Sequence, residues 1–244
     1  MKISYLITCS NETDTLLNLL GRVSHFITKE NNDEIVVLSD DSVINDRRSE
    51  IIGYTAGVIE SQLSCDTLEH GRFKLYNHKL NNDYGAHKNF GIERCSGDFI
   101  FQLDGDELPS ELIMGENLHA IINTNPLVEA YAVPRINDFK GVTAQHAKQW
   151  GWNLSLSQSY QRPIVNFPDF QFRIFKKVYP RISFTRRLHE KIEGYSLFVC
   201  LPAEEEYSIY HDKTIERQVE TNIMYNKLFS EKENQGHNVF DLKK

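Results

Sequence analysis

Short apolar runs separated by segments of helical periodicity make up the first hundred residues of the chain. Residues 3–8 (ISYLIT) and 34–39 (EIVVLS) are continuous apolar runs of the length expected for buried strands. Leucines and a valine recur at helical spacing over residues 11–26, where Asn11 or Thr13 is placed to cap the helix. The same alternation predicts helices at about 46–63 and at 85–94, and strands at 73–80 and 99–103. Repeated strand–helix–strand units predict an α/β fold with a mostly parallel, doubly wound sheet.

The pattern is less regular beyond residue 108. Residues 138–168 are rich in aromatic side chains and are predicted to be irregular, and the polar tail from Glu231 onward is expected to be loosely held. No linker separates two domains. The predicted elements are a helix at 109–123, strands at 129–134, 170–176, 182–185 and 207–210, and a final helix from about Thr214.

Polar clusters follow three of the predicted strands. They are Ser10-Asn11-Glu12, Ser39-Asp40-Asp41 and Asp104-Gly105-Asp106. Because ligands of such sheets bind at the carboxyl ends of the strands, we expect the three clusters to converge on one crevice. Two carboxylates separated by a glycine suit Mg²⁺ or Mn²⁺, which prefer oxygen ligands and often take only one or two from the protein. The alternative is a turn without a metal, since Asp and Gly favour turns.

Bulk properties narrow the classes of function. The chain has 244 residues, enough for one large α/β domain or two small ones, and 40% of them are hydrophobic, as in ordinary globular proteins. Its net charge of −7 argues against general binding to nucleic acid or anionic membranes. The four cysteines lack the spacing of a zinc site or disulfide framework. No apolar run approaches the length of a membrane span, and Met1 leads directly into a strand pattern rather than a signal peptide. We therefore expect a cytoplasmic protein, with peripheral contact at the inner face of the membrane if its substrate is membrane-bound.

Four segments resemble the family-2 glycosyltransferases with the A-type glycosyltransferase fold. They are LITCSNE, VVLSDDS, YGAHKNFGIERCSGDFIFQLDGDE, and the downstream pair RRLHEKIEGY and IYHDKTIERQ, the last two resembling the lipopolysaccharide-core glucosyltransferase-like subgroup. The resemblance implies a single domain with a Rossmann-like, mostly parallel sheet, helices on both faces and a mixed C-terminal part. It also implies metal-dependent, inverting transfer of a sugar, by a hexosyltransferase, from a nucleoside-diphosphate sugar to a hydroxyl of a glycan or lipid-linked acceptor.

The resemblance divides the chain into parts and also shows departures. Residues 1–108 would form the nucleotide-sugar-binding half, 109–230 the acceptor-binding and catalytic half of the same domain, and 231–244 the polar tail. Thr8-Cys9-Ser10 replaces the usual Pro-Thr-Tyr, and Lys88 replaces the usual Arg. These changes leave the nucleotide base open.

The resemblance assigns the donor and metal residues. Asp106 would contact the metal directly, Asp104 would bind the ribose or reach the metal through water, and His211 would be a third ligand, which suits Mn²⁺ better than Mg²⁺. The alternative for the two aspartates is a plain turn, and the alternative for His211 is a histidine that caps a strand end or the following helix. The remaining expected donor-binding residues are Cys9, Asn11, Glu12, Asp40, Asp41, Lys88, Asn89 and Gly105.

Charged residues of these clusters also have plainer explanations. Lys88 could pair with the diphosphate as a point charge or be a solvated helix lysine. Asn89 could only tie its helix to the sheet. Glu12, Asp40 and Asp41 could bind the base and ribose or simply supply negative charge near helix N-termini.

Catalytic and acceptor-binding residues are expected in the second half. Inverting transfer requires a base that takes the acceptor proton, and Glu190 is the candidate, with His189 orienting the acceptor or phosphate. Asp138 and Asp169 are the rival bases. The expected acceptor-binding residues are Arg186, Arg187, Trp150 and Trp152, for which surface salt bridges and core packing are the alternatives.

Two other classes of function remain open from the sequence. A sugar nucleotidyltransferase could use a similar sheet, but it would need a basic, Gly-rich loop after the first strand, where this chain has SNETDT. A non-catalytic nucleotide- or carbohydrate-binding protein could retain the fold without turnover.

Overall fold

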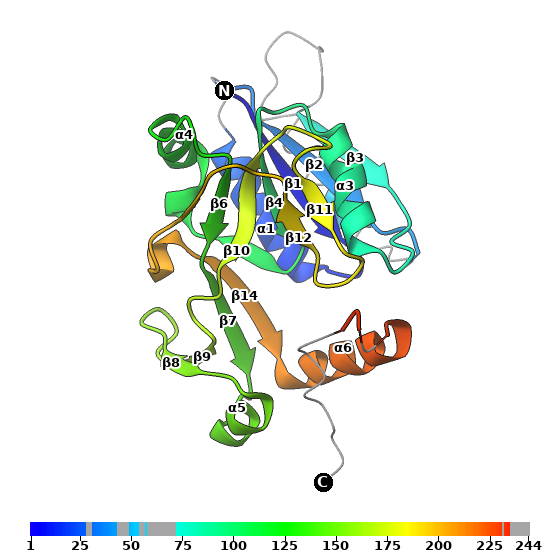
Figure 1. The fold of residues 1–244 in the computed structure, drawn as a ribbon, viewed down its shortest axis with the longest axis vertical. Coiled ribbons are helices and arrows are strands. Elements are labelled where there is room, and N and C mark those ends of the chain that lie inside the picture. The colour runs from blue at the N-terminus through cyan, green and yellow to red at the C-terminus, as the bar shows by residue number, and fades with distance from the viewer. Residues whose placement is uncertain (28–30, 43–48, 54–56, 58–71, 231, 235–244) are drawn as a thin grey trace.

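A seven-stranded sheet forms the centre of the protein (Figure 1). The computed structural model describes residues 1–27, 31–42, 49–53, 57, 72–230 and 232–234. β1, β2, β3 and β4 are parallel neighbours, whereas β10 is antiparallel to the strands on either side of it. The central sheet is therefore mostly parallel, as the sequence predicts. Its strands lie in the order β13 (Phe198–Cys200), β6 (Ala130–Val133), β10 (Gln171–Lys176), β4 (Phe99–Asp104), β1 (Ile3–Cys9), β2 (Glu34–Ser39) and β3 (Phe73–Asn77).

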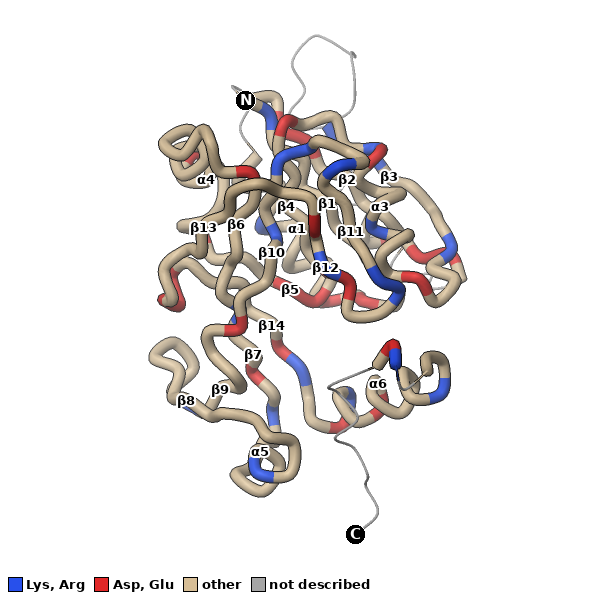
Figure 2. The backbone as a smooth tube through the Cα atoms, in the orientation of Figure 1, with Lys and Arg blue, Asp and Glu red and all other residues tan. Residues whose placement is uncertain are grey.

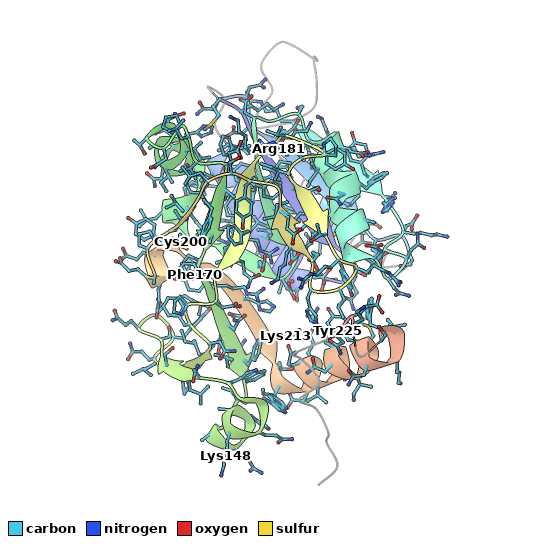
Figure 3. The ribbon with its side chains drawn as sticks, viewed as in Figure 1. Lys148, Phe170, Arg181, Cys200, Lys213 and Tyr225 are labelled. Carbon is cyan, nitrogen blue, oxygen red and sulfur yellow. The ribbon has the colours of Figure 1, made fainter. Side chains whose placement is uncertain are left out.

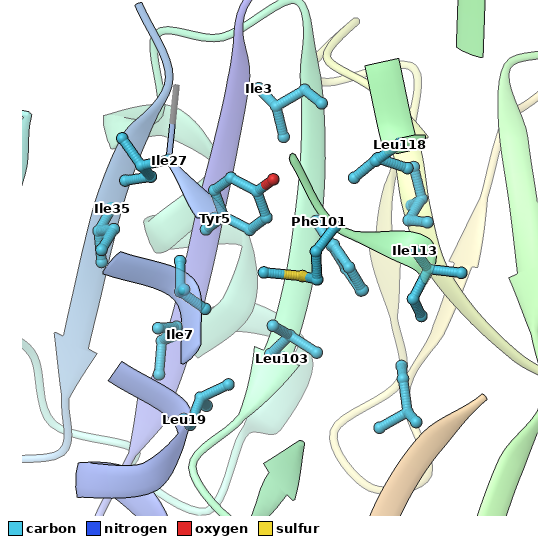
Figure 4. Packing of buried hydrophobic residues seen from close by; sticks show 14 of the residues in the cluster. Ile3, Tyr5, Ile7, Leu19, Ile27, Ile35, Phe101, Leu103, Ile113 and Leu118 are labelled. Atoms are coloured by element: carbon cyan, nitrogen blue, oxygen red, sulfur yellow. The ribbon is translucent and has the colours of Figure 1, made fainter. Parts of the chain in front are cut away.

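Different elements cover the two faces of this sheet, because successive side chains of a strand point to opposite faces. Ile3, Tyr5 and Ile7 of β1 point to one face and pack with Leu19 of α1 and with residues around α4 (Figure 4). Leu6 points to the other face, against α3 and the hairpin of β11 and β12. The covering elements are α1 (Asp14–Phe26), α4 (Gly115–Asn123), α3 (Tyr84–Arg94), β11 (Ser183–Thr185) and β12 (Lys191–Glu193).

A second, five-stranded sheet lies beyond the carboxyl ends of the parallel strands (Figure 1). Pro134 alone separates β6 of the central sheet from β7 of the second one, so the two sheets share a continuous chain. The long helix α6 (Ile215–Leu228) follows β14 directly and lies beside the ends of the central strands. The second sheet has the order β5 (Glu107–Pro109), β14 (Ile209–Thr214), β7 (Arg135–Lys140), β9 (Pro163–Val165) and β8 (Leu154–Leu156).

The structure corrects three of the predicted elements. Residues 138–168 are not irregular: they contain the end of β7, the helix α5 (Ala144–Trp150), β8 and β9. The helix predicted over 109–123 starts only at Gly115, because Pro109 ends β5 and a 3₁₀ turn, η1 (Glu111–Ile113), comes first. The strand predicted at 207–210 instead begins at Ile209, after the 3₁₀ turn η2 (Glu205–Tyr207). β8 and β9 have three residues each, which is too short to show the alternation of apolar and polar residues that predicts a strand.

Other predictions meet the structure in different ways. Strands from both expected halves build the central sheet, since β6, β10 and β13 come from beyond residue 108. The helix predicted at 46–63 and the tail from 231 fall mainly outside the described residues. No helix within the described part of the chain has both the length and the apolar character needed to cross a membrane.

Glu34 ties together the amino ends of the parallel strands. Its side chain is 1% exposed and accepts hydrogen bonds from Ser4 and Ser96, while Lys2 and Lys74 approach one carboxylate oxygen at 3.0 and 2.7 Å. Burial acts to raise the pKa of Glu34, but the hydrogen bonds from Lys74, Ser4 and Ser96 outweigh it and lower the pKa to about 2. The ion pairs and hydrogen bonds of Glu34 thus hold together the amino ends of the parallel strands. The polar clusters lie at the opposite, carboxyl ends.

Replacing Glu34 by Gln is expected to reduce the free energy of unfolding at pH 7 by about 3 kcal/mol. Because the pKa is lower in the folded protein than the ordinary value of 4.5, this stabilisation is complete above pH 4.5 and is lost as the pH falls toward 2. Urea titrations of wild type and Glu34→Gln across this range should therefore converge at low pH. A constant difference would contradict the role of the charge, and Glu116→Gln, at an exposed carboxylate on α4, serves as control.

Candidate functional site

Three polar clusters meet at the carboxyl ends of β1, β2 and β4. Cys9 of β1 is level with Ser39 of β2, and Thr8 is level with Asp104 of β4. The hydroxyl of Ser10 lies 3.3 Å from Asp40, and the Thr8 hydroxyl donates to Asp104 at 2.8 Å. The three clusters therefore meet at one edge of the central sheet, as predicted. Acidic positions gather around β5 and the neighbouring strand ends in Figure 2.

Gly105 allows β1 and β4 to approach closely within this turn. A Cβ at this position would lie 3.2 Å from Cβ of Cys9 and 3.3 Å from Cγ of Glu12, which is tighter than ordinary packing. The Gly105 amide donates to the carbonyl of Thr8 at 2.8 Å. Glycine therefore holds the two carboxylates of the turn close to the end of β1.

Two buried cations hold Asp104. Nζ of Lys88 on α3 lies 2.9 Å from one carboxylate oxygen, and the guanidinium of Arg173 on β10 lies 2.7 Å from the other. Burial acts to raise the pKa of Asp104, but Arg173 and Lys88 outweigh it and hold the pKa well below its ordinary value. Lys88 is 3% exposed, so it is not the solvated helix lysine that one interpretation of the sequence offers.

Arg173 is a site residue that the sequence reasoning missed. The pairing of β10 with β6 slips by one residue between Phe172 and Ile174, which leaves Arg173 as the extra residue of a bulge. Its side chain also contacts Glu107, whose other oxygen accepts the backbone N–H of Asp104 at 3.1 Å. The available signal was a lone arginine in the otherwise apolar run FRIF, residues 172–175.

Asp106 and His211 face one another across the site. Oδ2 of Asp106 lies 3.6 Å from Nε2 of His211, which is on β14 of the second sheet rather than past a strand end. Burial acts to raise the pKa of Asp106, but the imidazole of His211, when it is protonated, outweighs this effect and lowers the pKa to about 2. The second sheet thereby brings residue 211 back to the turn that ends β4.

Two further cations lie on the second-sheet side of Asp106. The guanidinium of Arg217, in the first turn of α6, is 3.9 Å from Asp106 and 3.6 Å from Glu12. Burial lowers the pKa of Lys213, while the nearby charge of Asp106 opposes that effect. Figure 3 labels Lys213, near the end of β14, and Tyr225, on the side of α6 that faces the central sheet. The carboxyl group of Glu12 lies in the same region as these cations, and burial raises its pKa.

The loop that carries the candidate base packs against the start of α3. Oε1 of Glu190 lies 2.6 Å from Nζ of Lys88, so Lys88 contacts Asp104 and Glu190 at once. The loop has left-handed backbone at Arg186 (φ 69°) and His189 (φ 52°), where non-glycine residues are strained. A Cβ at Gly85 would overlap the backbone carbonyl of Arg186, so only glycine permits this contact.

Several predicted residues lie near this loop with partners of their own. Nε2 of His189 is 3.0 Å from Oδ1 of Asn234, and exposed Arg187 is 3.4 Å from Glu233. Asn89 exchanges two hydrogen bonds with the backbone of Phe184, which ties α3 to β11 as one interpretation of the sequence proposes.

Both rival bases are paired with an arginine. Asp138 is on β7 between Asn137 and Phe139, and its carboxylate pairs with Arg162. Since neighbouring residues of a strand point to opposite faces, Asp138 faces away from the side of the second sheet that carries Asn137. Asp169 is bound by Arg135 and by Asn137.

Trp150 and Trp152 pack in a separate core cluster with Phe139 and Val165. Trp150 is 5% exposed, and the two indole rings meet edge to face at 4.6 Å. Their geometry is that of core packing, the alternative weighed for them from the sequence. Asp41 and Asn11 are exposed beside the strand ends.

The donor set at Asp106 and His211 fits a divalent cation in part. Within the described ranges, no group of three or more His, Cys, Asp or Glu side chains is arranged to hold a metal ion. Both oxygens of Asp104 already face cations, which leaves one carboxylate and one imidazole converging at 3.6 Å. Mg²⁺ and Mn²⁺ commonly take one or two protein ligands and complete their shell with water and phosphate oxygens. The residues therefore fit a cation that a phosphate ligand helps to hold.

Comparison with solved structures establishes the fold. The crystal structure of TarS from S. aureus superposes with a TM-score of 0.54 at 14% identity, covering 95% of this chain and 41% of that chain. The crystal structure of TarS 1-349 gives 0.52 at 15% identity, with coverages of 98% and 70%. The complex of TarS 1-349 with UDP-GlcNAc gives 0.51 at 13% identity, with coverages of 87% and 59%. The chain thus spans less than half of the length of the first of these proteins.

The sequence itself matches a known family. No curated protein sequence matches the chain. The sequence model described as Glycosyl transferase family 2 matches residues 4–185, which include the strand ends, the DGD turn and β11. The mixed α/β domain with a mostly parallel central sheet agrees with the A-type glycosyltransferase fold of the structural neighbours. The chain belongs to glycosyl transferase family 2.

Proposed function

We propose that the protein is a metal-dependent, inverting glycosyltransferase that moves a sugar from a nucleoside-diphosphate sugar to a hydroxyl group of a glycan or lipid-linked acceptor. One observation carries the proposal: Lys88 contacts both Asp104, in the turn after β4, and Glu190, on the loop of the second half. The ammonium group of Lys88 thus lies between the proposed donor site at Asp104 and the proposed base, Glu190. A lipid-linked acceptor would require peripheral contact with a membrane, and we expect this at the cytoplasmic face.

The donor would lie along the carboxyl ends of β1, β2 and β4. Asp40 and Glu12 offer oxygens for base and ribose hydroxyls, with Asp41 and Asn11 beside them. Asp106 and His211 would hold the cation, and Arg217 lies close enough to reach a phosphate on the same side. UDP is the first nucleotide to try, because a structural neighbour of the same fold binds UDP-GlcNAc.

Catalysis would proceed by direct displacement at the anomeric carbon. A divalent cation, when bound, neutralises charge on the departing diphosphate. Glu190 takes the proton of the acceptor hydroxyl as that oxygen forms its bond to the anomeric carbon. The bond from this carbon to the phosphate oxygen breaks, its electron pair leaves with the nucleoside diphosphate, and the configuration inverts. Lys88 holds the Glu190 side chain at 2.6 Å, and His189 lies one residue before it to orient the acceptor or phosphate.

The two other classes of function fit the site less well. A nucleotidyltransferase needs a phosphate-cradling loop after the first strand, and the residues that follow β1 here are acidic, with Glu12 in the site. A non-catalytic binding protein gives no reason for a carboxylate beside Lys88 on a strained loop. RRLHEKIEGY and IYHDKTIERQ carry the resemblance to the lipopolysaccharide-core subgroup, which supports a glycan acceptor and transfer of a hexose.

A panel of nucleotide sugars tests the proposal directly. Purified protein is incubated with UDP-, GDP- and other sugar nucleotides, with and without Mn²⁺ or Mg²⁺, and the release of nucleoside diphosphate is measured. We expect release from one donor class that EDTA abolishes. NMR of the product sugar then shows whether the anomeric configuration inverts. Binding of a nucleotide without release from any donor, with acceptor glycans present, would favour the non-catalytic class.

Asp106→Ala is expected to abolish metal-dependent release, since it removes the carboxylate that faces His211. Calorimetry with Mn²⁺ and UDP should show loss of the metal contribution to nucleotide binding. The matched control is Asp98→Ala, which removes an exposed carboxylate at the opposite end of β4. Undiminished metal dependence in Asp106→Ala would move the cation elsewhere.

Glu190→Gln is expected to lower kcat by roughly 10²–10⁴-fold while donor binding is retained, because the amide cannot accept the proton. Steady-state kinetics and a donor-binding titration measure the two effects separately. Glu193→Gln, an exposed position on β12 of the same hairpin, is the control and should keep wild-type activity. If Glu190→Gln is fully active, another residue is the base.

Gly85→Ala is expected to lower kcat by at least about tenfold, because the added Cβ would push away the loop backbone at Arg186 and with it Glu190. Donor affinity should change much less. Gly21→Ala on α1 is the control, since an added Cβ there meets no atom within 4 Å. Equal kcat in wild type and Gly85→Ala would show that the position of this loop does not govern turnover.

A further inference from the structure

Asn137 lies directly behind His211. The two residues are level on the parallel strands β7 and β14. Nδ1 of His211 is 2.9 Å from Oδ1 of Asn137, whereas Nε2, on the other side of the ring, is 3.6 Å from Asp106. The imidazole therefore has an amide on one side and the proposed cation site on the other.

The partners of the Asn137 amide determine which of its ends faces His211. Nδ2 donates to Oδ2 of Asp169 at 2.9 Å and lies 3.5 Å from the backbone carbonyl of Val165. A carboxylate and a carbonyl only accept hydrogen bonds, so the NH₂ group must point toward them. Oδ1 is left for His211, and because this oxygen only accepts, Nδ1 of the imidazole must donate.

Asp169 is itself held firmly in place. Nε and a terminal nitrogen of Arg135 lie 3.0 and 2.7 Å from its Oδ2, and Gln171 donates to Oδ1 at 2.8 Å. Arg135 also reaches Glu107, which supports the backbone of the DGD turn. Arg135 fixes the carboxylate of Asp169, and this carboxylate in turn fixes the orientation of the Asn137 amide.

We propose that Asn137 is a positioning residue that holds neutral His211 with its proton on Nδ1, so that the Nε2 lone pair faces Asp106 as a ligand for a divalent cation. The inference rests on the proposed function for the metal, but the tautomer itself does not. Without Asn137, the Asp106 carboxylate would draw the proton to Nε2, where it would occupy the lone pair that a cation needs. Partners of this kind behind a histidine ligand commonly change metal affinity by about 10- to 100-fold.

The first test reads the tautomer of His211 without metal. Histidine labelled with ¹⁵N gives long-range ¹H–¹⁵N correlations that distinguish Nδ1–H from Nε2–H, recorded at a pH where the ring is neutral. The His211 signals are those missing from His211→Gln. We expect Nδ1–H in wild type and Nε2–H in Asn137→Leu. An Nε2–H ring in wild type would overturn the proposal, and this outcome needs no variant to fold.

The second test measures Mn²⁺ affinity by electron paramagnetic resonance in the presence of UDP. We expect Asn137→Leu to bind Mn²⁺ at least about tenfold more weakly than wild type. Lys140→Ala, at the exposed end of β7, is the control and should keep wild-type affinity. Equal affinity in Asn137→Leu and wild type would overturn the proposal. Failure of wild type to bind Mn²⁺ with UDP would instead refute the metal in the proposed function, while the spectrum still decides the tautomer.

Discussion

The pairing of partly exposed Asp104 with buried Lys88 and Arg173 is the interaction on which the rest of the site depends. Each partner comes from a different element, so the three charges join the end of β4 to α3 and to β10. A bulge in β10 aims Arg173 at this point, and Glu107 ties the same arginine to the DGD turn. The position of Asp106 follows from this arrangement.

The same cation links the two ends of the proposed reaction. Lys88 contacts Glu190 as well as Asp104. It therefore connects the loop that carries the candidate base to the turn after β4. Gly85 allows that loop to rest on α3. On the opposite side, the second sheet brings His211 toward Asp106. A donor held at the strand ends would lie between these two supports, and small displacements of either would alter reaction geometry.

Much of this arrangement was predictable from the sequence, for physical reasons that also explain the failures. The parallel strands are continuous apolar runs, and the polar clusters at their ends could be located because Asp40 and Asp104 directly follow such runs. Arg173, Glu107 and Asn137 were not singled out, since their significance arises only when distant strands become neighbours: Arg173 reaches Asp104 across 69 positions of sequence. The tryptophans suggested an acceptor surface, but Trp150 is buried with Phe139, a contact that local sequence does not reveal. The short strands β8 and β9 show no period.

The central claim is that Asp106 and His211 hold a cation that binds the diphosphate of the donor at the ends of β1 and β4. Anomalous diffraction from crystals grown with Mn²⁺ and UDP tests it most directly. The account predicts one strong manganese peak between the Asp106 carboxylate and Nε2 of His211, in contact with the diphosphate. UDP bound at the strand ends without manganese, or manganese bound away from these two side chains, would contradict it.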